Sequence, residues 1–239
     1  WDYEDVLHPP RQEDGRLYYR EVRLMKSRID EELDKLGLGT MSLSTLVEEA
    51  LGIITSSLNN SYGKERIREI AQDIEEKSKS LESSCINLLL KYHPVARDLK
   101  RISSTLCTIR DLSRIGDNSL DFCEMLDYLS SPDICREIGL LDMALNVKKM
   151  LSDAISAFMS KDLDKAKKVE AFDDVVDEGF SNARKKLCEF IRSGRDGYEE
   201  AADVVIGAKY LERMGDHAAS IAHAVIEECG TVEDVKSEG

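Results

Sequence analysis

The sequence has little that would interrupt a helix or build a sheet. Its 239 residues include only four prolines, and aromatic residues make up 6%. Proline breaks helices from within, so its scarcity leaves room for long ones. A chain that is rich in aliphatic residues, poor in aromatic ones and 33% charged fits a helical bundle better than a β-sandwich. No segment alternates with period two for long enough to predict a strand, so we expect an all-α fold.

Long apolar runs, a secretory signal and Cys-x-x-Cys pairs are also missing. No run reaches the ~18 apolar residues that a membrane helix needs. Several of the six cysteines fall in apolar helical stripes, which predicts reduced core residues in a cytoplasmic protein and no disulfides or zinc ligands. Trp1 is not an initiator residue. We therefore expect a trimmed chain, and a lost leader or N-terminal domain stays open.

Positive charge is in deficit. The formal net charge is −14, which disfavours binding to nucleic acid and to anionic lipid. Such a surface suits multivalent cations or basic protein surfaces. The alternative, that the acidic residues only keep the protein in solution, stays open.

Apolar periodicity predicts two similar halves, in which a helical pattern begins and then begins again. Residues 1–16 are polar and are expected to form a tail or linker, and 231–239 a second tail. The first repeat is assigned to 17–131 and includes a linker helix. The second is assigned to 132–230, because Ser131-Pro132-Asp133 interrupts the chain before the pattern begins again.

Glycine and proline set the expected helix ends. Gly37 and Gly39 are expected to stop the first helix, and Ser42 to cap a second one. A third helix is expected over 64–92. His93-Pro94 then ends it, with Pro94 in the first turn of a fourth helix that continues to about Leu129. Asn59, Asn60 and Gly63 predict a turn before the third helix, and Gly194 and Gly197 predict a break before the last one.

The two halves can be aligned with each other. At an offset of 101 residues, apolar positions match (Leu46 with Val147), and so do three acidic ones: Glu69 with Glu170, Asp73 with Asp174, and Glu76 with Asp177. At an offset of 99, Arg114-Ile115-Gly116-Asp117 matches Arg213-Met214-Gly215-Asp216. A glycine inside a helix costs ~1 kcal/mol relative to alanine, so its repetition indicates close backbone approach. A tight helix crossing without chemistry is the alternative.

Several carboxylates are spaced four residues apart, which places them on one face of a helix. The pairs are Glu69 and Asp73, Glu170 and Asp174, Asp173 and Asp177, and Glu212 and Asp216. Two such pairs that face each other would supply oxygen ligands for iron, manganese, magnesium or calcium, and less typically for zinc. A solvated acidic face is the alternative for any single pair.

The motifs His93-Pro94-Val95-Ala96-Arg97-Asp98-Leu99, Asp111 to Asp117 and Tyr210 to Ala218 resemble the two repeats of the PhoU family, over roughly residues 20–229. The resemblance implies two pseudo-symmetric three-helix bundles of up-down helices, similar to spectrin repeats, with metal clusters on an acidic face.

The family motif is an acidic residue four before an aspartate, on two helices of each repeat. The resemblance carries the ligand role in the second half to Glu170, Asp174, Glu212 and Asp216, and we add Asp177. In the first half it carries the role to Glu69, Asp73 and Asp117. The fourth position there is Ser113, for which Asp121 is a substitute, so we expect tighter binding in the second half. Arg114, Gly116, Arg213 and Gly215 are expected to be structural.

The resemblance also implies a function. Such proteins restrain phosphate uptake and phosphate-starvation signalling, through a phosphate ABC transporter ATPase and a sensor histidine kinase. We therefore expect a non-enzymatic, metal-binding regulator that forms a homodimer and reaches the membrane only through its partners. Iron or zinc is the expected metal, with manganese or magnesium as alternatives. The domain also occurs fused to other modules, including DNA-binding ones.

Two other functions stay open. A carboxylate-bridged di-metal enzyme would use Glu-x-x-His, but none of the four histidines, at 8, 93, 217 and 223, has a glutamate three residues before it. A metal-free helical scaffold is the other. Neither Gly-x-Ser-x-Gly nor a phosphate-binding glycine loop is present, which disfavours nucleophilic catalysis.

Overall fold

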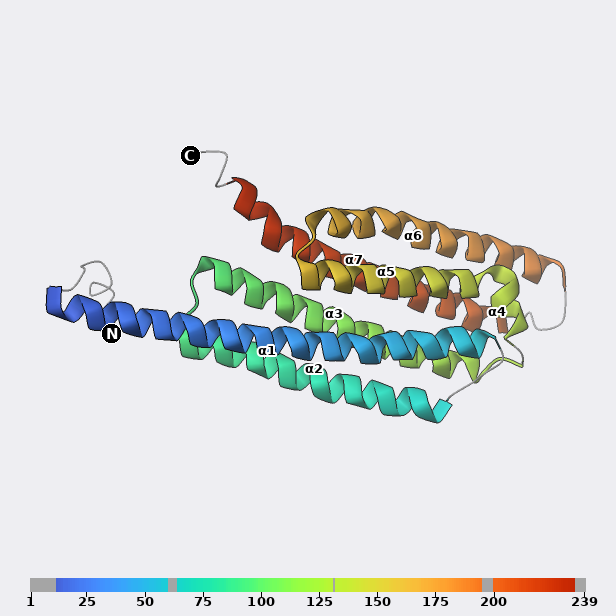
Figure 1. The fold of residues 1–239 in the computed structure, drawn as a ribbon. Coiled ribbons are helices and arrows are strands. Elements are labelled where there is room, and N and C mark those ends of the chain that lie inside the picture. Colours follow the sequence, from blue (N-terminus) through green and yellow to red (C-terminus); the bar gives the residue numbers. More distant parts are fainter. Residues whose placement is uncertain (1–11, 60–63, 131, 195–199, 235–239) are drawn as a thin grey trace.

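The computed structural model describes residues 12–59, 64–130, 132–194 and 200–234. Helices account for nearly all of these ranges (Figure 1), which contain no strand. Their bounds are α1 Gln12–Leu58, α2 Lys64–Tyr92, α3 Ala96–Leu126, α4 Asp133–Ile138, α5 Leu140–Ser160, α6 Leu163–Arg192 and α7 Ala201–Asp234. None of the described helices is both long and apolar enough to span a membrane. The predicted all-α fold is confirmed.

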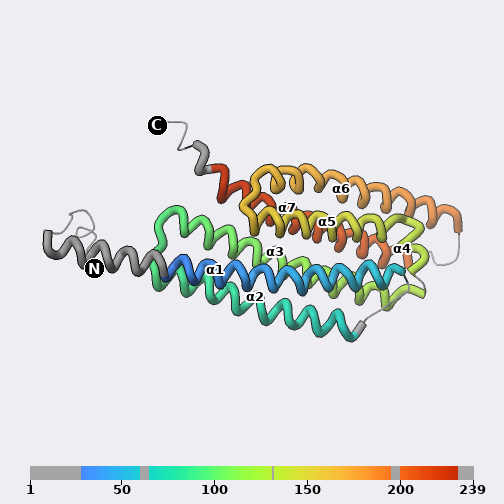
Figure 2. Tube along the Cα trace, in the orientation of Figure 1, coloured from blue at the N-terminus to red at the C-terminus, as the bar shows by residue number. Residues whose placement is uncertain are grey.

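The helices form two three-helix bundles that lie side by side. The first consists of α1, α2 and α3, and the second of α5, α6 and α7, as the trace in Figure 2 shows. Helix α1 packs on α5 and α3 on α7, so four helices make the centre while α2 and α6 lie outermost. The buried side chains of both halves belong to one contiguous apolar cluster. The two predicted bundles are therefore present, and they share a core.

Helix α1 is continuous where the sequence predicted a break. The apolar stripe runs without interruption through Leu36, Leu43 and Val47, all buried, so the segment loses no packing by staying helical. Gly39 lies inside the helix, because a side chain there would meet the Leu81 side chain of α2 at 2.5 Å. The predicted stop at Gly37 and Gly39 and the predicted cap at Ser42 are therefore wrong: close approach, not chain reversal, accounts for Gly39.

Other predicted ends differ by a few residues. Helix α1 already includes 12–16, α3 ends at Leu126 rather than Leu129, and α7 includes 231–234. Pro94 precedes α3, whose N-cap is Val95, so its predicted place in the first turn is also wrong. The predicted stop of α2 before His93-Pro94 is confirmed. Gly194, at φ +63°, follows α6, while residues 1–11, 60–63, 131, Gly197 and 235–239 lie outside the described residues.

The register of the repeat follows from which side chains are buried. Between α1 and α5 the buried positions match at an offset of 100, as in Val47 with Val147 and Leu51 with Leu151. Between α2 and α6 they match at 102, as in Ile67 with Val169, Ile74 with Val176 and Cys85 with Leu187. Between α3 and α7 the predicted offset of 99 holds, as in Leu112 with Leu211. The predicted offset of 101 for the first two helices is therefore wrong.

The repeated glycines lie where helices approach each other closely. A Cβ atom on Gly116 of α3 would lie 2.8 Å from Cγ2 of Ile74 on α2, and one on Gly215 of α7 would lie 3.0 Å from Cγ1 of Val176 on α6. Real Cβ atoms essentially never come closer than 3.0 Å to another side chain. Each glycine thus lets the outer helix of its bundle pack against the inner one.

Candidate metal centre

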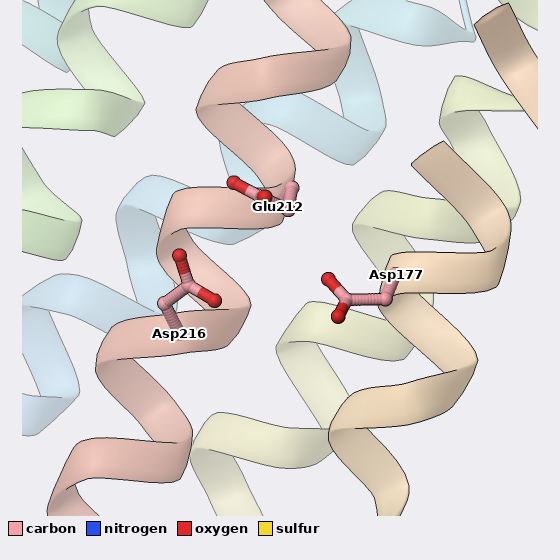
Figure 3. Close-up of side chains that lie close together, drawn as sticks. All are labelled: Asp177, Glu212 and Asp216. Atoms are coloured by element: carbon pink, nitrogen blue, oxygen red, sulfur yellow. The ribbon is translucent and has the colours of Figure 1, made fainter. Parts of the chain in front are cut away.

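Acidic side chains from α6 and α7 converge in the second bundle. Asp177, Glu212 and Asp216 each offer one carboxylate oxygen, and these atoms lie within 4.8 Å of one another. Figure 3 shows Glu212 and Asp216 on successive turns of α7, with Asp177 reaching toward them from α6. Because Gly215 brings the two helices together, carboxylates that flank this contact are forced to face each other.

Asp173 is the fourth acidic side chain of this cluster. It lies one turn before Asp177 on α6, and its Oδ1 is 3.5 Å from where a Cβ of Gly215 would lie. Burial first, and then the charges of Asp216, Asp177, Asp174 and Glu212, together raise the pKa of Asp173 to about 6. The pKa of Asp216 is also raised, first by burial and then by Glu212. The site therefore carries negative charge that the protein itself compensates poorly.

Two carboxylate oxygens of the cluster are buried without a partner. Asp173 Oδ1 and Glu212 Oε2 accept no hydrogen bond from any described residue, although Glu212 Oε1 accepts one from Lys209 Nζ. Buried polar atoms are normally satisfied, because an unmade hydrogen bond costs ~1–3 kcal/mol. Oxygen ligands that converge on one point fit a hard or borderline cation. The residues present thus suit a metal ion.

The structure places the other predicted ligands of α6 elsewhere. Glu170 Oε1 lies 2.7 Å from His223 Nδ1 on α7, nearly two turns away from Asp177. Asp174 is exposed, since it lies about 100° around the helix from Asp173. Glu212, Asp216 and Asp177 are brought together as predicted, but Asp173 takes the place that the sequence gave to Glu170 and Asp174. The pair Asp173 and Asp177 was visible in the sequence; only the buried face of α6 shows that it points to α7.

The first half does not repeat this arrangement. In the register of the buried residues, the counterparts of Asp173, Asp177, Glu212 and Asp216 are Ala71, Glu75, Ser113 and Asp117. Two of the four acids are thus missing. The match of Glu69 with Glu170 and of Asp73 with Asp174 came from the wrong offset.

The predicted first-half ligands have other surroundings. Glu69 pairs with Arg66 at 3.1 Å and Asp117 with Arg114 at 3.4 Å, while Asp73 is exposed. Asp121 is exposed too, and burial, Asp117 and Glu124 raise its pKa. Among the described residues, the cluster on α6 and α7 is the one place where three potential ligand atoms come together.

Asp111, to which the sequence analysis gave no role in a site, connects the two bundles beside this cluster. From α3, its Oδ1 lies 2.9 Å from His217 Nδ1 and its Oδ2 accepts a hydrogen bond of 2.7 Å from Ser220 Oγ, both on α7. His217 follows the candidate ligand Asp216 directly, so the contact fixes the rotation of α7 at the site. No local pattern in the sequence could reveal a partner 106 residues away.

Equivalent positions in the two halves carry ion pairs of opposite polarity. Arg68 of α2 lies 3.5 Å from Glu124 of α3, whereas Glu170 of α6 pairs with His223 of α7. The hydrogen bond and the charge of Glu170 raise the pKa of His223. The interaction therefore stabilises the fold below the ordinary histidine pKa and is lost as the pH rises through the raised value.

We expect Glu170→Gln to reduce the stability of the metal-free protein by less than about 1 kcal/mol at pH 5.5, since the pair is exposed, and to leave it unchanged at pH 9. Urea unfolding at both pH values measures this. An equal loss at both would show that protonation of His223 is not involved.

Comparison with known proteins reveals similarity along most of the chain. The model of the PhoU domain matches twice, over residues 40–126 and 140–225. A curated relative from Thermotoga maritima, the phosphate-specific transport system accessory protein PhoU homolog 1, is 32% identical over 87% of both chains. A PhoU homolog of the same description from Pseudomonas aeruginosa is 26% identical over 84% of this chain and 85% of its own.

Solved structures agree with these matches. The crystal structure of PhoU from Pseudomonas aeruginosa superposes with a TM-score of 0.77 at 25% identity, covering 83% of this chain and 97% of that one. The phosphate transport system regulatory protein PhoU from Streptococcus pneumoniae, 20% identical, has a TM-score of 0.71 over 84% and 96% of the two chains, which shows a shared fold.

Proposed function

Because the chain belongs to the PhoU family, we propose that it is a non-enzymatic, metal-binding regulator of phosphate uptake and of phosphate-starvation signalling. The relatives are named accessory proteins of a phosphate-specific transport system, which supports a regulatory role beside a transporter. We propose a phosphate ABC transporter ATPase and a sensor histidine kinase as its partners, negative regulation as its effect, and a homodimer as its working form.

The observation that carries the metal part of this proposal is the acidic cluster with its two unpartnered buried oxygens. Asp177, Glu212 and Asp216 would hold the ion, with Asp173 at its side. A bound cation would supply the positive charge that these carboxylates lack. The potential ligand atoms that lie together are all carboxylate oxygens, while the nearby histidines direct their Nδ1 atoms to Asp111 and Glu170. That set favours iron, manganese or magnesium over zinc.

A metal held there would affect regulation through the packing of α6 on α7. Without it, four carboxylates repel one another across the contact at Gly215. With it, the outer helix α6 is fixed to the centre of the molecule. We propose that partners distinguish these two conditions on the face that α6 and α7 form.

Elemental analysis of purified protein tests the metal site. We expect Asp177→Asn to lower bound metal to less than about a tenth of the wild-type amount, because losing one of three carboxylate ligands weakens binding by at least a factor of ten. Asp174→Asn is the matched control: it makes the same change in charge on the same helix, three residues away and outside the cluster, and should retain the metal.

Other outcomes would decide between the remaining functions. Equal metal loss in both variants would show that Asp174 is a ligand, as the sequence analysis predicted. A wild type that takes up no iron, manganese, magnesium or zinc would contradict the metal site and favour a scaffold. Oxidation of ferrous iron or hydrolysis of a phosphate ester that Asp177→Asn abolishes would show an enzyme. Repeated failure to co-purify a transporter ATPase would contradict the regulatory assignment.

A further inference from the structure

A cavity of about 520 Å³ opens between α5 and the first turns of α6, and no residue of the acidic cluster lines it. Met150 and Val169, both buried, form its apolar floor together with the ring of Phe172. Its volume lies within the range of about 300–1,000 Å³ that is usual for small-molecule sites. Lys149, Lys165 and Lys168 lie around its rim.

Two of these lysines have no acidic partner among the described residues. Lys165 Nζ pairs with Asp153 at 3.3 Å and donates to Ser156 Oγ. Lys149, in contrast, lies over the Phe172 ring with its Nζ 4.2 Å from the centroid, and Lys168 makes neither a hydrogen bond nor an ion pair within the described ranges. Two unpaired cations beside one cavity are unexpected in a chain whose net charge is −14.

The acidic side chains of the rim do not compensate these lysines. Asp153 is paired with Lys165, and Asp162 accepts the hydrogen bond of the Lys165 backbone N–H as the N-cap of α6. Asp164 is exposed and makes no ion pair with Lys168, although the two are one helical turn apart. Lys149 and Lys168 thus outnumber Asp164, which leaves an excess of one positive charge among the unpaired side chains that line the cavity.

At the equivalent position of the first half, two side chains of the protein form an ion pair with each other. In the register of the buried residues, Lys149 corresponds to Glu49 and Lys168 to Arg66. Glu49 Oε1 accepts two hydrogen bonds from the Arg66 guanidinium, at 2.8 and 3.0 Å. An ion pair across the helices in one half is therefore replaced by two like charges in the other, where an anion from outside would complete the interaction.

The ring that lines the cavity has an equivalent too. Phe172 corresponds to Ile70, which is fully buried, whereas Phe172 is only partly so. Lys149 Nζ lies over this ring, so a planar base that displaces the ammonium group can stack there while the same lysine turns to the phosphate groups. An inorganic anion would fill only a small part of the cavity.

We propose that this cavity binds a nucleotide, with the phosphate groups between Lys149 and Lys168 and the base against Phe172. The proposal does not depend on the metal site, because the two sites use different residues of α6. Lys149 and Lys168 are exposed, so both can be changed without disturbing the core, whereas Phe172 is partly buried and packs against it.

Calorimetric titration with ATP, ADP and AMP in the presence of EDTA tests the proposal, since the chelator excludes binding through a metal ion. We expect saturable binding that Lys149→Glu and Lys168→Gln each weaken by about tenfold or more. Lys149→Glu should also raise the melting temperature, because it recreates with Lys168 the ion pair that Glu49 forms with Arg66. Phe172→Leu should weaken nucleotide binding and leave the circular dichroism spectrum, and hence the fold, unchanged.

Glu49→Gln in the first half is the matched control and should leave nucleotide binding unchanged. The proposal is overturned if no nucleotide binds at millimolar concentration. It is equally overturned if Lys149→Glu binds as the wild type does, or if inorganic phosphate binds as tightly as ADP.

Discussion

Phe122→Ala is expected to lower the free energy of unfolding by about 3–5 kcal/mol, the usual cost of removing a buried phenyl ring. Phe122 is fully buried on α3. Its Cε2 atom lies 3.4 Å from where a Cβ of Gly207 on α7 would lie, so the ring fills space between the two bundles. A cavity there weakens the contact on which both halves depend. Urea unfolding followed by circular dichroism measures the change.

The same experiment tests whether the two halves share a core. Since the buried side chains of both bundles form one cluster, unfolding should remain a single transition that moves as a whole. Tyr128→Ala is the control, because this ring is 74% exposed and its loss should change the stability by less than about 0.5 kcal/mol. Two separate transitions, of which only one is displaced, would show that the bundles unfold independently.

Asp173→Asn is expected to stabilise the metal-free protein and to weaken metal binding. The pKa of Asp173 is raised to about 6 from the ordinary 3.8. A group whose pKa is raised in the folded state contributes stability at low pH, and that contribution is lost as the pH rises through the raised value. A pKa that is about two higher in the folded state corresponds to about 3 kcal/mol of stability. Because the side chain is partly exposed to solvent, we expect about 1–2 kcal/mol.

The change in stability caused by Asp173→Asn should have opposite signs without and with metal. In EDTA at pH 7.5 the variant should unfold at higher urea concentration than the wild type, and the difference should disappear at pH 4. With saturating iron or manganese the order should reverse, because the wild type gains more from binding. Equal stability of the two proteins at pH 7.5, with and without metal, would contradict the placement of Asp173 beside the cluster.

The sequence predicted the fold class, because apolar periodicity depends only on which residues face the core, and the resemblance to the PhoU family predicted the two three-helix bundles. Helix ends were less well predicted. Gly39 was taken as a stop, since local propensity cannot show that Leu81 of another helix requires a small residue there. The glycines in Arg-Ile-Gly-Asp and Arg-Met-Gly-Asp were interpreted correctly as close approaches, because their repetition added information that a single glycine lacks.

The candidate site could be predicted only in part. On α7 the spacing offered a single pair, Glu212 and Asp216, and the structure places both on the side of the helix that faces α6. On α6 two overlapping acidic pairs, Glu170 with Asp174 and Asp173 with Asp177, have the same spacing, and spacing cannot choose between them. The choice depends on the rotation of the helix, which Val169 and Val176 set by packing against the core. A shift of one residue in the alignment of the repeats was enough to favour Glu170 and Asp174 over Asp173 and Asp177.

The reversed polarity of the two equivalent ion pairs has a consequence for how the chain assembles. Two look-alike bundles in one polypeptide risk exchanging their outer helices. If α6 docked in the place of α2, Glu170 would meet Glu124; if α2 docked in the place of α6, Arg68 would meet His223. The first exchange would bring two carboxylates together, and the second would bring two positive charges together when His223 is protonated. The two pairs thus favour the docking of each outer helix on its own half and disfavour forms in which the outer helices are exchanged.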